Sequence, residues 1–113
     1  MDNQPTGTGC VFCKVVKKEL PAEVIYEDEG VVGVLDIYPK APGHTMVLPK
    51  AHAEIILDLT DAEGGALVAA LKHVTALLKR ALNPDGFTIG VNHGRAAGQA
   101  IDHVHIHVIP RWA

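Results

Sequence analysis

The segment from His103 to Ile109 reads H-V-H-I-H-V-I and constrains the fold most, because histidine and aliphatic residues alternate in it with a period of two. Successive side chains of a β-strand point to opposite faces of a sheet. The pattern therefore predicts a strand over residues 101–109 whose three imidazoles share one face while the aliphatic side chains enter the core. Neighbouring imidazoles on that face are expected about 7 Å apart.

Three imidazoles on one strand face are compatible with three kinds of role. They could form a solvent-facing polar stripe, although Lys, Glu or Thr would serve that purpose equally well. Neutral imidazoles at alternate strand positions can chelate zinc. An imidazole with an ordinary pKa of about 6.5 is mostly neutral at neutral pH, so it can also attack phosphorus or transfer a proton. The spacing alone does not decide between metal binding and catalysis.

The loop that leads into this strand, residues 92–99, reads N-H-G-R-A-A-G-Q. Gly94 and Gly98 have permissive backbones that can turn N–H groups inward as an anion-binding nest. The loop lacks the G-K-[ST] of a Walker A motif and the G-x-G-x-x-G of a dinucleotide fingerprint. Its direct connection to the histidine strand indicates a phosphate site beside a row of imidazoles.

The remaining patterns predict an α+β domain with a five-stranded antiparallel sheet, one long helix and a short N-terminal helix. A capping box at Thr60 and Glu63 precedes apolar residues three and four apart, which predicts a long helix to about residue 82. A short helix is expected within residues 10–20, and residues 1–9 are expected to be a flexible tail before a single domain at 10–113. The expected strands are residues 23–27, 31–37, 44–49, 87–92 and 101–109.

Composition excludes several classes of partner. The formal net charge is −3, so the chain has no basic field for nucleic acid or anionic lipid. Its longest apolar run, residues 66–71, is far shorter than a membrane span. The two cysteines, Cys10 and Cys13, form a C-x-x-C pair that indicates a metal site or a redox pair in a cytoplasmic protein.

The histidine segment resembles the signature of the histidine triad (HIT) nucleotide-binding family. The resemblance extends to the upstream N-x-G-x-x-x-G-Q, to L-D-I-Y-P-K-A-P-G-H-T-M-V-L-P-K-A-H and to Y-E-D-E, and it covers nearly everything from Cys10 to Arg111. It implies an antiparallel sheet with a long helix, usually in a homodimer, that binds purine nucleotides and cleaves bonds at the α-phosphate.

The resemblance also implies roles for individual residues. His105 corresponds to the nucleophile that forms a nucleotidyl-histidine intermediate, which water then hydrolyses. His107 would contact the phosphate and aid the leaving group, and His44 would support the nucleophile's network. The nucleotide would be an AMP-like purine nucleotide. Its expected binding residues are Val11, Phe12, Val15, Val34, Asp36, Ile37, Asn92, Gly98, Gln99, Ala100, His105 and His107, of which Asp36 matches the ribose-binding carboxylate and the apolar residues match those that sandwich the base.

Two departures from the family pattern bear on the activity. Many members carry Ser or Thr after the G-Q, whereas this chain has Ala100 and lacks that hydroxyl. Asn92 stands where the fragile-histidine-triad branch uses Gln, so the resemblance is closer to the phosphoramidate-hydrolase branch. The expected activity is therefore release of a nucleoside monophosphate from a phosphoramidate or related conjugate. The alternatives are a non-catalytic nucleotide-binding adaptor and a dinucleoside polyphosphate hydrolase.

The C-x-x-C pair supplies two thiolates, and four-coordinate zinc needs two more ligands. Some bacterial family members are similar in having zinc at C-x-x-C, at the histidine after P-K and at the first triad histidine. The corresponding residues here are Cys10, Cys13, His52 and His103, which predicts one structural zinc ion.

Overall fold

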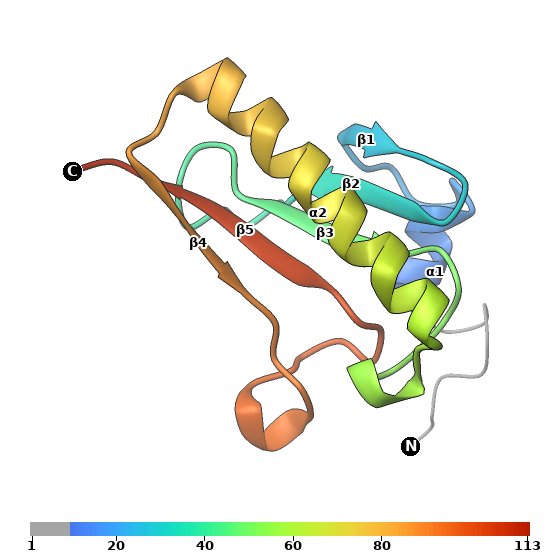
Figure 1. Ribbon diagram of the computed structural model, residues 1–113. Coiled ribbons are helices and arrows are strands. Elements are labelled where there is room, and N and C mark those ends of the chain that lie inside the picture. Colours follow the sequence, from blue (N-terminus) through green and yellow to red (C-terminus); the bar gives the residue numbers. More distant parts are fainter. Residues whose placement is uncertain (1–9) are drawn as a thin grey trace.

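The computed structural model describes residues 10–113, and the predicted tail at 1–9 lies outside the described residues. Figure 1 shows their arrangement as helices packed on a twisted sheet. The helices are α1 (Val11–Val16), the short 3₁₀-helix η1 (Ile56–Asp58), α2 (Asp61–Leu82) and the 3₁₀-helix η2 (Arg95–Ala97). The strands are β1 (Val24–Glu27), β2 (Val31–Leu35), β3 (Thr45–Pro49), β4 (Gly86–Gly90) and β5 (Ile106–Arg111). No helix within residues 10–113 is long and apolar enough to cross a membrane.

The strands form one sheet in the order β1-β2-β3-β5-β4, and every neighbouring pair is antiparallel. Strand β5 lies inside the sheet between β3 and β4, with His107 opposite Met46 on one side and Gly90 on the other. The predicted five-stranded antiparallel α+β fold is therefore confirmed for the described residues.

Helix α2 begins where the capping box predicts. The Thr60 hydroxyl accepts the Glu63 N–H at 3.0 Å, and the Glu63 carboxylate accepts the Thr60 N–H at 2.9 Å. Such caps contribute about 1 kcal/mol, which offsets part of the helix propensity lost at Gly64 and Gly65. The helix ends at Leu82, and its C-cap Asn83 is left-handed, with a φ of 48° and a ψ of 52°. This conformation is a common helix stop.

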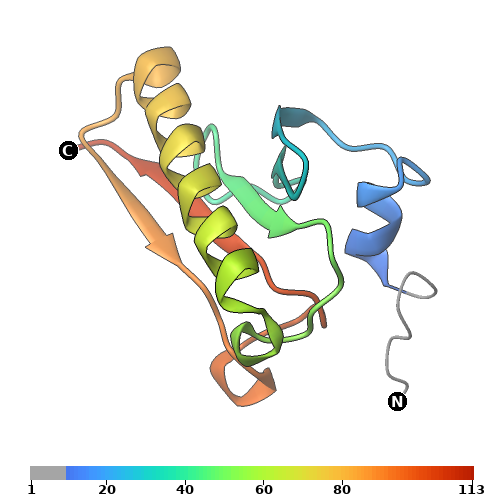
Figure 2. The same cartoon turned by 45° about the vertical axis from the view of Figure 1, so that its right-hand side comes forward.

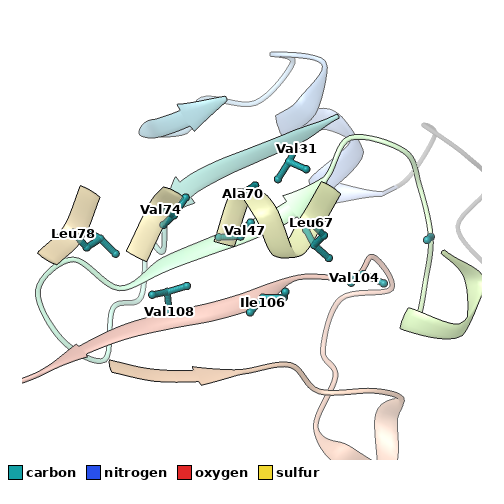
Figure 3. Packing of buried hydrophobic residues seen from close by; sticks show 10 residues of the cluster. Val31, Val47, Leu67, Ala70, Val74, Leu78, Val104, Ile106 and Val108 are labelled. Atoms are coloured by element: carbon teal, nitrogen blue, oxygen red, sulfur yellow. The ribbon is translucent and has the colours of Figure 1, made fainter. Parts of the chain in front are cut away.

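One face of the sheet is covered by α2. Leu67, Ala70, Val74 and Leu78 form the buried stripe of the helix. They pack against Val31, Val47, Val104, Ile106 and Val108 from the sheet side (Figure 3). The aliphatic members of the histidine segment therefore enter this core, as the period of two predicts.

The opposite face of the sheet is covered by α1. Phe12 and Cys13 of this helix pack in a second cluster with Val32, Val34 and Leu48. Val32 and Val34 alternate with Val31 along the strand, so β2 contributes to both clusters. Figure 2 shows α1 and α2 on either side of β3. The histidine side chains of the β5 segment face the α1 side, where the candidate site lies.

The histidine strand is shorter than predicted. Strand β5 starts at Ile106, so His103 and His105 lie in the extended segment before it. The ladder with β3 ends at the pair Val47–Ile106, because the backbone N–H of Val104 donates to the Ala53 carbonyl instead of to β3. The pairing partner changes, but the alternation of side chains continues through this segment.

Three other strand ends differ from the predictions by two residues: β5 continues to Arg111 instead of residue 109, and β2 and β4 end early. Strand β2 ends at Leu35 instead of residue 37, since the Asp36 N–H donates to the His44 carbonyl across the following loop. Strand β4 covers Gly86–Gly90 instead of residues 87–92. Both shortened ends release residues of the candidate site, Ile37 and Asn92, into loops.

Candidate active site

The ring of His105 is held in one orientation by the backbone. Its Nδ1 lies 2.8 Å from the carbonyl oxygen of His103, which can only accept, so Nδ1 carries the hydrogen and donates it. In the neutral ring Nε2 is then unprotonated and keeps a free lone pair. The Phe12 ring packs edge-on against His105 with 5.0 Å between centroids. His105 therefore presents the bare nitrogen that a nucleophile requires.

A chain of hydrogen bonds orients His107. The Lys40 backbone N–H donates to His44 Nδ1 at 3.1 Å, so the hydrogen of the neutral His44 ring sits on Nε2. That Nε2 lies 2.9 Å from His107 Nδ1 and 3.5 Å from Asp36 Oδ2. Because His107 Nδ1 accepts, the hydrogen of its own ring sits on Nε2. His107 is thus a hydrogen-bond donor beside the bare nitrogen of His105.

Burial keeps this relay neutral. It lowers the pKa of His44 and of His107 below the ordinary value of 6.5, because a charged imidazole would lose its hydration. The carboxylate of Asp36 acts in the opposite direction and is the weaker influence on both rings. The two rings are therefore neutral at neutral pH, and the hydrogen-bond directions given above apply.

The rings of His105 and His107 stand closer than strand geometry predicts. Their centroids are 5.0 Å apart and the ring planes are inclined by 78°. The predicted spacing of about 7 Å is the distance between alternate residues of an extended strand. The side chains lean toward each other in an edge-to-face contact, which brings the bare nitrogen and the donor to one small region.

A cavity of about 490 Å³ opens beside these two imidazoles. Its wall contains nearly all the residues that the sequence predicts for nucleotide binding: Val11, Phe12, Val15, Val34, Asp36, Ile37, Asn92, Gly98, Ala100, His105 and His107. Helix α1 contributes the first three, and the segment from β2 into the next loop contributes the following three. The apolar residues and the imidazoles thus share one cavity.

Several lining residues were not predicted: Leu20, Pro21, Ala22, Leu35, Tyr38, Lys40, Met46 and Ile101. One of them had a signal in the sequence, because Met46 pairs with Val34 across β2 and β3 and so shares its face. The others lie in loops or at strand ends. Loop residues have no periodicity from which their direction follows.

Gln99 does not line the cavity. Its side chain is 4% exposed and fastens the loop from inside. Its Oε1 accepts the Gly94 N–H at 2.7 Å, and its Nε2 donates to the carbonyls of Glu54 at 2.6 Å and Ile101 at 2.9 Å. The structure thus places Gln99 under the loop, where it positions the residues that do face the cavity.

The glycines of this loop shape its backbone. Gly94 and Gly98 have φ values of 89° and 95°, which side-chain-bearing residues rarely adopt. Their N–H groups donate within the loop, to Gln99 Oε1 and to the Arg95 carbonyl. The two amides are therefore already used and do not form the predicted nest. Gly98 instead brings bare backbone to the cavity wall.

A cluster of two thiols and two imidazoles lies next to the site. The ligand atoms of Cys10, Cys13, His52 and His103 all lie within 4.8 Å of one another. Cys10 is the N-cap of α1, and its Sγ accepts the Cys13 N–H at 3.3 Å. The four predicted metal ligands, which come from three separated segments, are thus brought together.

The imidazoles of the cluster are oriented toward the thiols. His103 Nε2 donates to the Pro49 carbonyl at 2.8 Å, which leaves Nδ1 bare at 3.4 Å from Cys10 Sγ. His52 Nδ1 lies 3.1 Å from Cys13 Sγ. Burial lowers the pKa of His103 to about 4, so this ring is neutral at neutral pH. This donor set of two sulfurs and two nitrogens suits tetrahedral zinc. The Pro49 carbonyl fixes the orientation of the His103 ring, as outer hydrogen bonds commonly do for histidine ligands.

Burial also raises the pKa of the Cys10 thiol to about 11. Both cysteines are free thiols, so they form no disulfide. A bound cation would favour the thiolate that metal coordination requires.

Comparison with known proteins identifies the family. Residues 17–113 match the HIT domain family. An uncharacterized HIT-like protein of Methanocaldococcus jannaschii is 46% identical, over 91% of this chain and 79% of that protein. An adenosine 5′-monophosphoramidase of Schizosaccharomyces pombe is 37% identical, over 90% of this chain and 74% of that protein. An adenylylsulfatase of Arabidopsis thaliana is 36% identical, over 90% of this chain and 52% of that protein.

Solved structures agree with the sequence match. A HIT family protein from Bacillus anthracis superposes with a TM-score of 0.90 at 36% identity, covering 93% of this chain and 74% of that one. A zinc-bound histidine triad family protein from Mycobacterium smegmatis superposes with a TM-score of 0.88 at 39% identity, covering 93% and 76%. The chain therefore belongs to the histidine triad (HIT) family.

Proposed function

We propose that this protein hydrolyses a purine nucleotide conjugate at its α-phosphate, with His105 as nucleophile. One observation carries the proposal: the His103 carbonyl accepts a hydrogen bond from Nδ1–H of His105. The neutral His105 ring, which lines the cavity, therefore has an unprotonated Nε2. The relatives that include a monophosphoramidase and an adenylylsulfatase support hydrolysis of AMP conjugates. The proposed substrate class is a nucleoside phosphoramidate or a related conjugate.

The proposed reaction has two displacements at phosphorus. The Nε2 lone pair of His105 forms a bond to the α-phosphorus while the bond to the leaving atom breaks and its electrons go to that atom. Water then forms the new P–O bond, the N–P bond breaks, its electrons return to Nε2, and the proton of water is released. The leaving nitrogen of a phosphoramidate gains a proton from solvent as the P–N bond breaks, and the proton that water releases in the second displacement replaces it. His107 carries a hydrogen on Nε2 and would donate a hydrogen bond from it to the phosphoryl oxygen or the leaving atom. His44 positions His107 through the 2.9 Å contact between their rings.

The cavity wall supports a nucleoside in a defined orientation. Val11, Phe12 and Val15 on one side and Val34 and Ile37 on the other would enclose the base, since apolar walls of this kind suit flat rings. Asp36 lines the same cavity, with its Oδ2 3.5 Å from His44 Nε2, and would accept hydrogen bonds from the ribose hydroxyls. Asn92 and Ala100 would approach the phosphate from the loop side. Gln99 would support that loop without touching the nucleotide.

Ala100 motivates a second candidate function, a nucleotide-binding adaptor without turnover, because it leaves the loop side of the cavity without a side-chain donor at that position. A single-turnover trapping experiment separates the two. A hydrolase acquires a covalent nucleotide at His105, whereas an adaptor binds reversibly. Turnover of a dinucleoside polyphosphate at equal concentration tests the third candidate activity.

The decisive assay is AMP release from adenosine 5′-phosphoramidate by the wild type, His105→Ala and the control His73→Ala. The control removes an exposed imidazole from α2 and should keep full activity. Loss of release in His105→Ala with AMP binding retained is the expected result. Wild type that binds AMP but releases none from any conjugate would contradict the hydrolase and favour the adaptor.

We also propose that Cys10, Cys13, His52 and His103 bind one structural zinc ion. The support is the convergence of their ligand atoms and the zinc-bound relative from Mycobacterium smegmatis. Four protein ligands would close the coordination sphere, so the ion would tie α1 to the sheet and take no part in the chemistry.

A homodimer and a cytoplasmic location complete the proposal. Strand β4 is an edge of the sheet. Ile89 within it is 47% exposed, Val91 just after it is 36% exposed, and Trp112 is 46% exposed. An apolar edge of this kind is suited to pairing with a second copy. The free thiols agree with a reducing compartment. Sedimentation of the wild type against Ile89→Lys measures the dimer, which the substitution should weaken.

A further inference from the structure

Only two charged side chains line the cavity among the described residues, Asp36 and Lys40. Asp36 is already engaged: its Oδ1 accepts the Tyr38 N–H at 2.9 Å, and its Oδ2 lies 3.5 Å from His44 Nε2. The Lys40 ammonium makes no ion pair or hydrogen bond within residues 10–113. The cavity therefore holds one cation that is free to receive a ligand.

Lys40 stands on the imidazole side of the cavity. Its own backbone N–H donates to His44 Nδ1, so its backbone is fixed by the relay. Its side chain is exposed and lines the same cavity as His105 and His107. From this place in the cavity wall a lysine side chain can reach a leaving group bound beside the two imidazoles.

The known kinds of conjugate differ in the charge of what leaves. A phosphoramidate releases ammonia or an amine, and this leaving group must gain a proton. Once the amine is protonated, it is repelled by a nearby cation. A phosphosulfate or polyphosphate releases an anion. This leaving group needs no proton, and a nearby cation attracts it. The chain as a whole has a formal charge of −3, so only a local cation favours an anionic group here.

We propose that Lys40 is a specificity-determining residue that binds the anionic leaving group of a nucleotide mixed anhydride, such as a nucleoside 5′-phosphosulfate or polyphosphate. The inference rests on the proposed hydrolase function and narrows its substrate class. In the first displacement the His105 lone pair forms the N–P bond while the bond between phosphorus and the bridging oxygen breaks. The electron pair goes to that oxygen, and sulfate departs as a dianion beside the ammonium. Water then releases AMP and a proton.

The experiment compares adenosine 5′-phosphosulfate with adenosine 5′-phosphoramidate on four proteins: wild type, Lys40→Met, Lys40→Arg and the control Lys72→Met. Lys72 is exposed on α2 and lies outside this cavity. Lys40→Met should lower kcat/KM for the phosphosulfate about tenfold, the usual scale for a lost charged contact. It should leave kcat/KM for the phosphoramidate within about twofold, and Lys40→Arg should restore the phosphosulfate rate.

Two results would overturn the inference. Equal losses on both substrates would assign Lys40 to the shared α-phosphate, and equal retention would show that it binds neither group. Failure of the wild type on both substrates would instead reject the hydrolase proposal. In that case binding gives the same comparison. The dissociation constants of both compounds are measured for His105→Ala and for the double variant His105→Ala/Lys40→Met. The inference then requires a selective loss of phosphosulfate affinity, and an equal change would overturn it.

Discussion

The carbonyl oxygen of His103 accepts the hydrogen bond that orients the ring of His105, while the ring of His103 itself faces the thiols of the cysteine cluster. The cluster and the candidate nucleophile are therefore joined by three residues of backbone. Phe12 of α1 reinforces this link, because its ring contacts both His103 and His105 at centroid distances of 5.9 and 5.0 Å. A displacement of α1 would therefore shift His105 in two ways, through the contact with Phe12 and through the backbone of His103.

Cys13→Ser should abolish binding of one zinc ion per chain. The wild type would be stabilised by about 2.7 kcal/mol at free zinc 100 times the dissociation constant, and the variant would lose this contribution. Metal content by mass spectrometry and unfolding with and without chelator measure both effects. His73→Ala is the control that keeps the ion. A metal-free wild type of unchanged stability would contradict the prediction.

His44→Ala should lower kcat by at least about 10²-fold, because His107 loses the partner that sets its tautomer. In the wild type, burial holds the pKa of His44 and His107 below 6.5, so activity should persist as pH falls to that value and decline further down. A pH profile of kcat/KM checks the acidic limb. An acidic limb centred above pH 7 would show that the relay is not neutral as described.

Gln99→Ala should destabilise the fold while removing no contact with the nucleotide. It leaves the Gly94 N–H and the Glu54 carbonyl without the Gln99 partner, at about 1 to 3 kcal/mol for each group that water does not reach, while the Ile101 carbonyl keeps the His103 N–H. Arg95→Ala on the same loop removes an ion pair to Asp102 whose arginine is 71% exposed, and should cost at most about 1 kcal/mol. Denaturant unfolding compares the two variants, and equal costs would argue against the buried clamp.

Gly43→Ala should destabilise the protein by about 1 to 3 kcal/mol, because its φ of 86° is left-handed. An added Cβ would also lie 2.5 Å from Leu82 Cδ1. Gly30→Ala is the matched control, since no atom lies within 4 Å of a Cβ there. Thermal unfolding of both variants measures the difference. A Gly43→Ala protein as stable as Gly30→Ala would show that this turn relaxes freely.

Glu27→Gln should make stability less dependent on acid pH. Lys18 and Lys50 each lie 2.8 Å from this carboxylate and hold its pKa near 2, against an ordinary 4.5. A depressed carboxylate pKa stabilises the fold above the ordinary value, and the contribution disappears as pH falls from about 4.5 toward 2. The stability difference between wild type and Glu27→Gln should shrink in that window. A difference that stays constant from pH 6 to pH 2 would rule out this linkage, and Glu29→Gln is the control.

Much of the fold follows from local patterns. The period of two at residues 103–109 places the aliphatic side chains in the α2 core and the imidazoles on the other side, even where the strand itself starts late. The capping box specifies the start of α2, because its hydrogen bonds join residues three apart. Strand ends were less predictable: β5 begins at Ile106 only because Val104 bonds to Ala53, a contact between distant segments.

The sequence by itself determined the residue types of the site, through the histidine alternation, the C-x-x-C pair and the motifs of the family. Only the tertiary structure decided how they are joined. It brings Cys10 to His103 across 93 residues, places Gln99 under the loop, and puts Lys40 in the cavity wall beside the relay. The physical reason is that alternation and caps depend on neighbours in the chain. Tautomers, ligand clusters and cavity walls depend instead on packing between segments that the sequence keeps far apart.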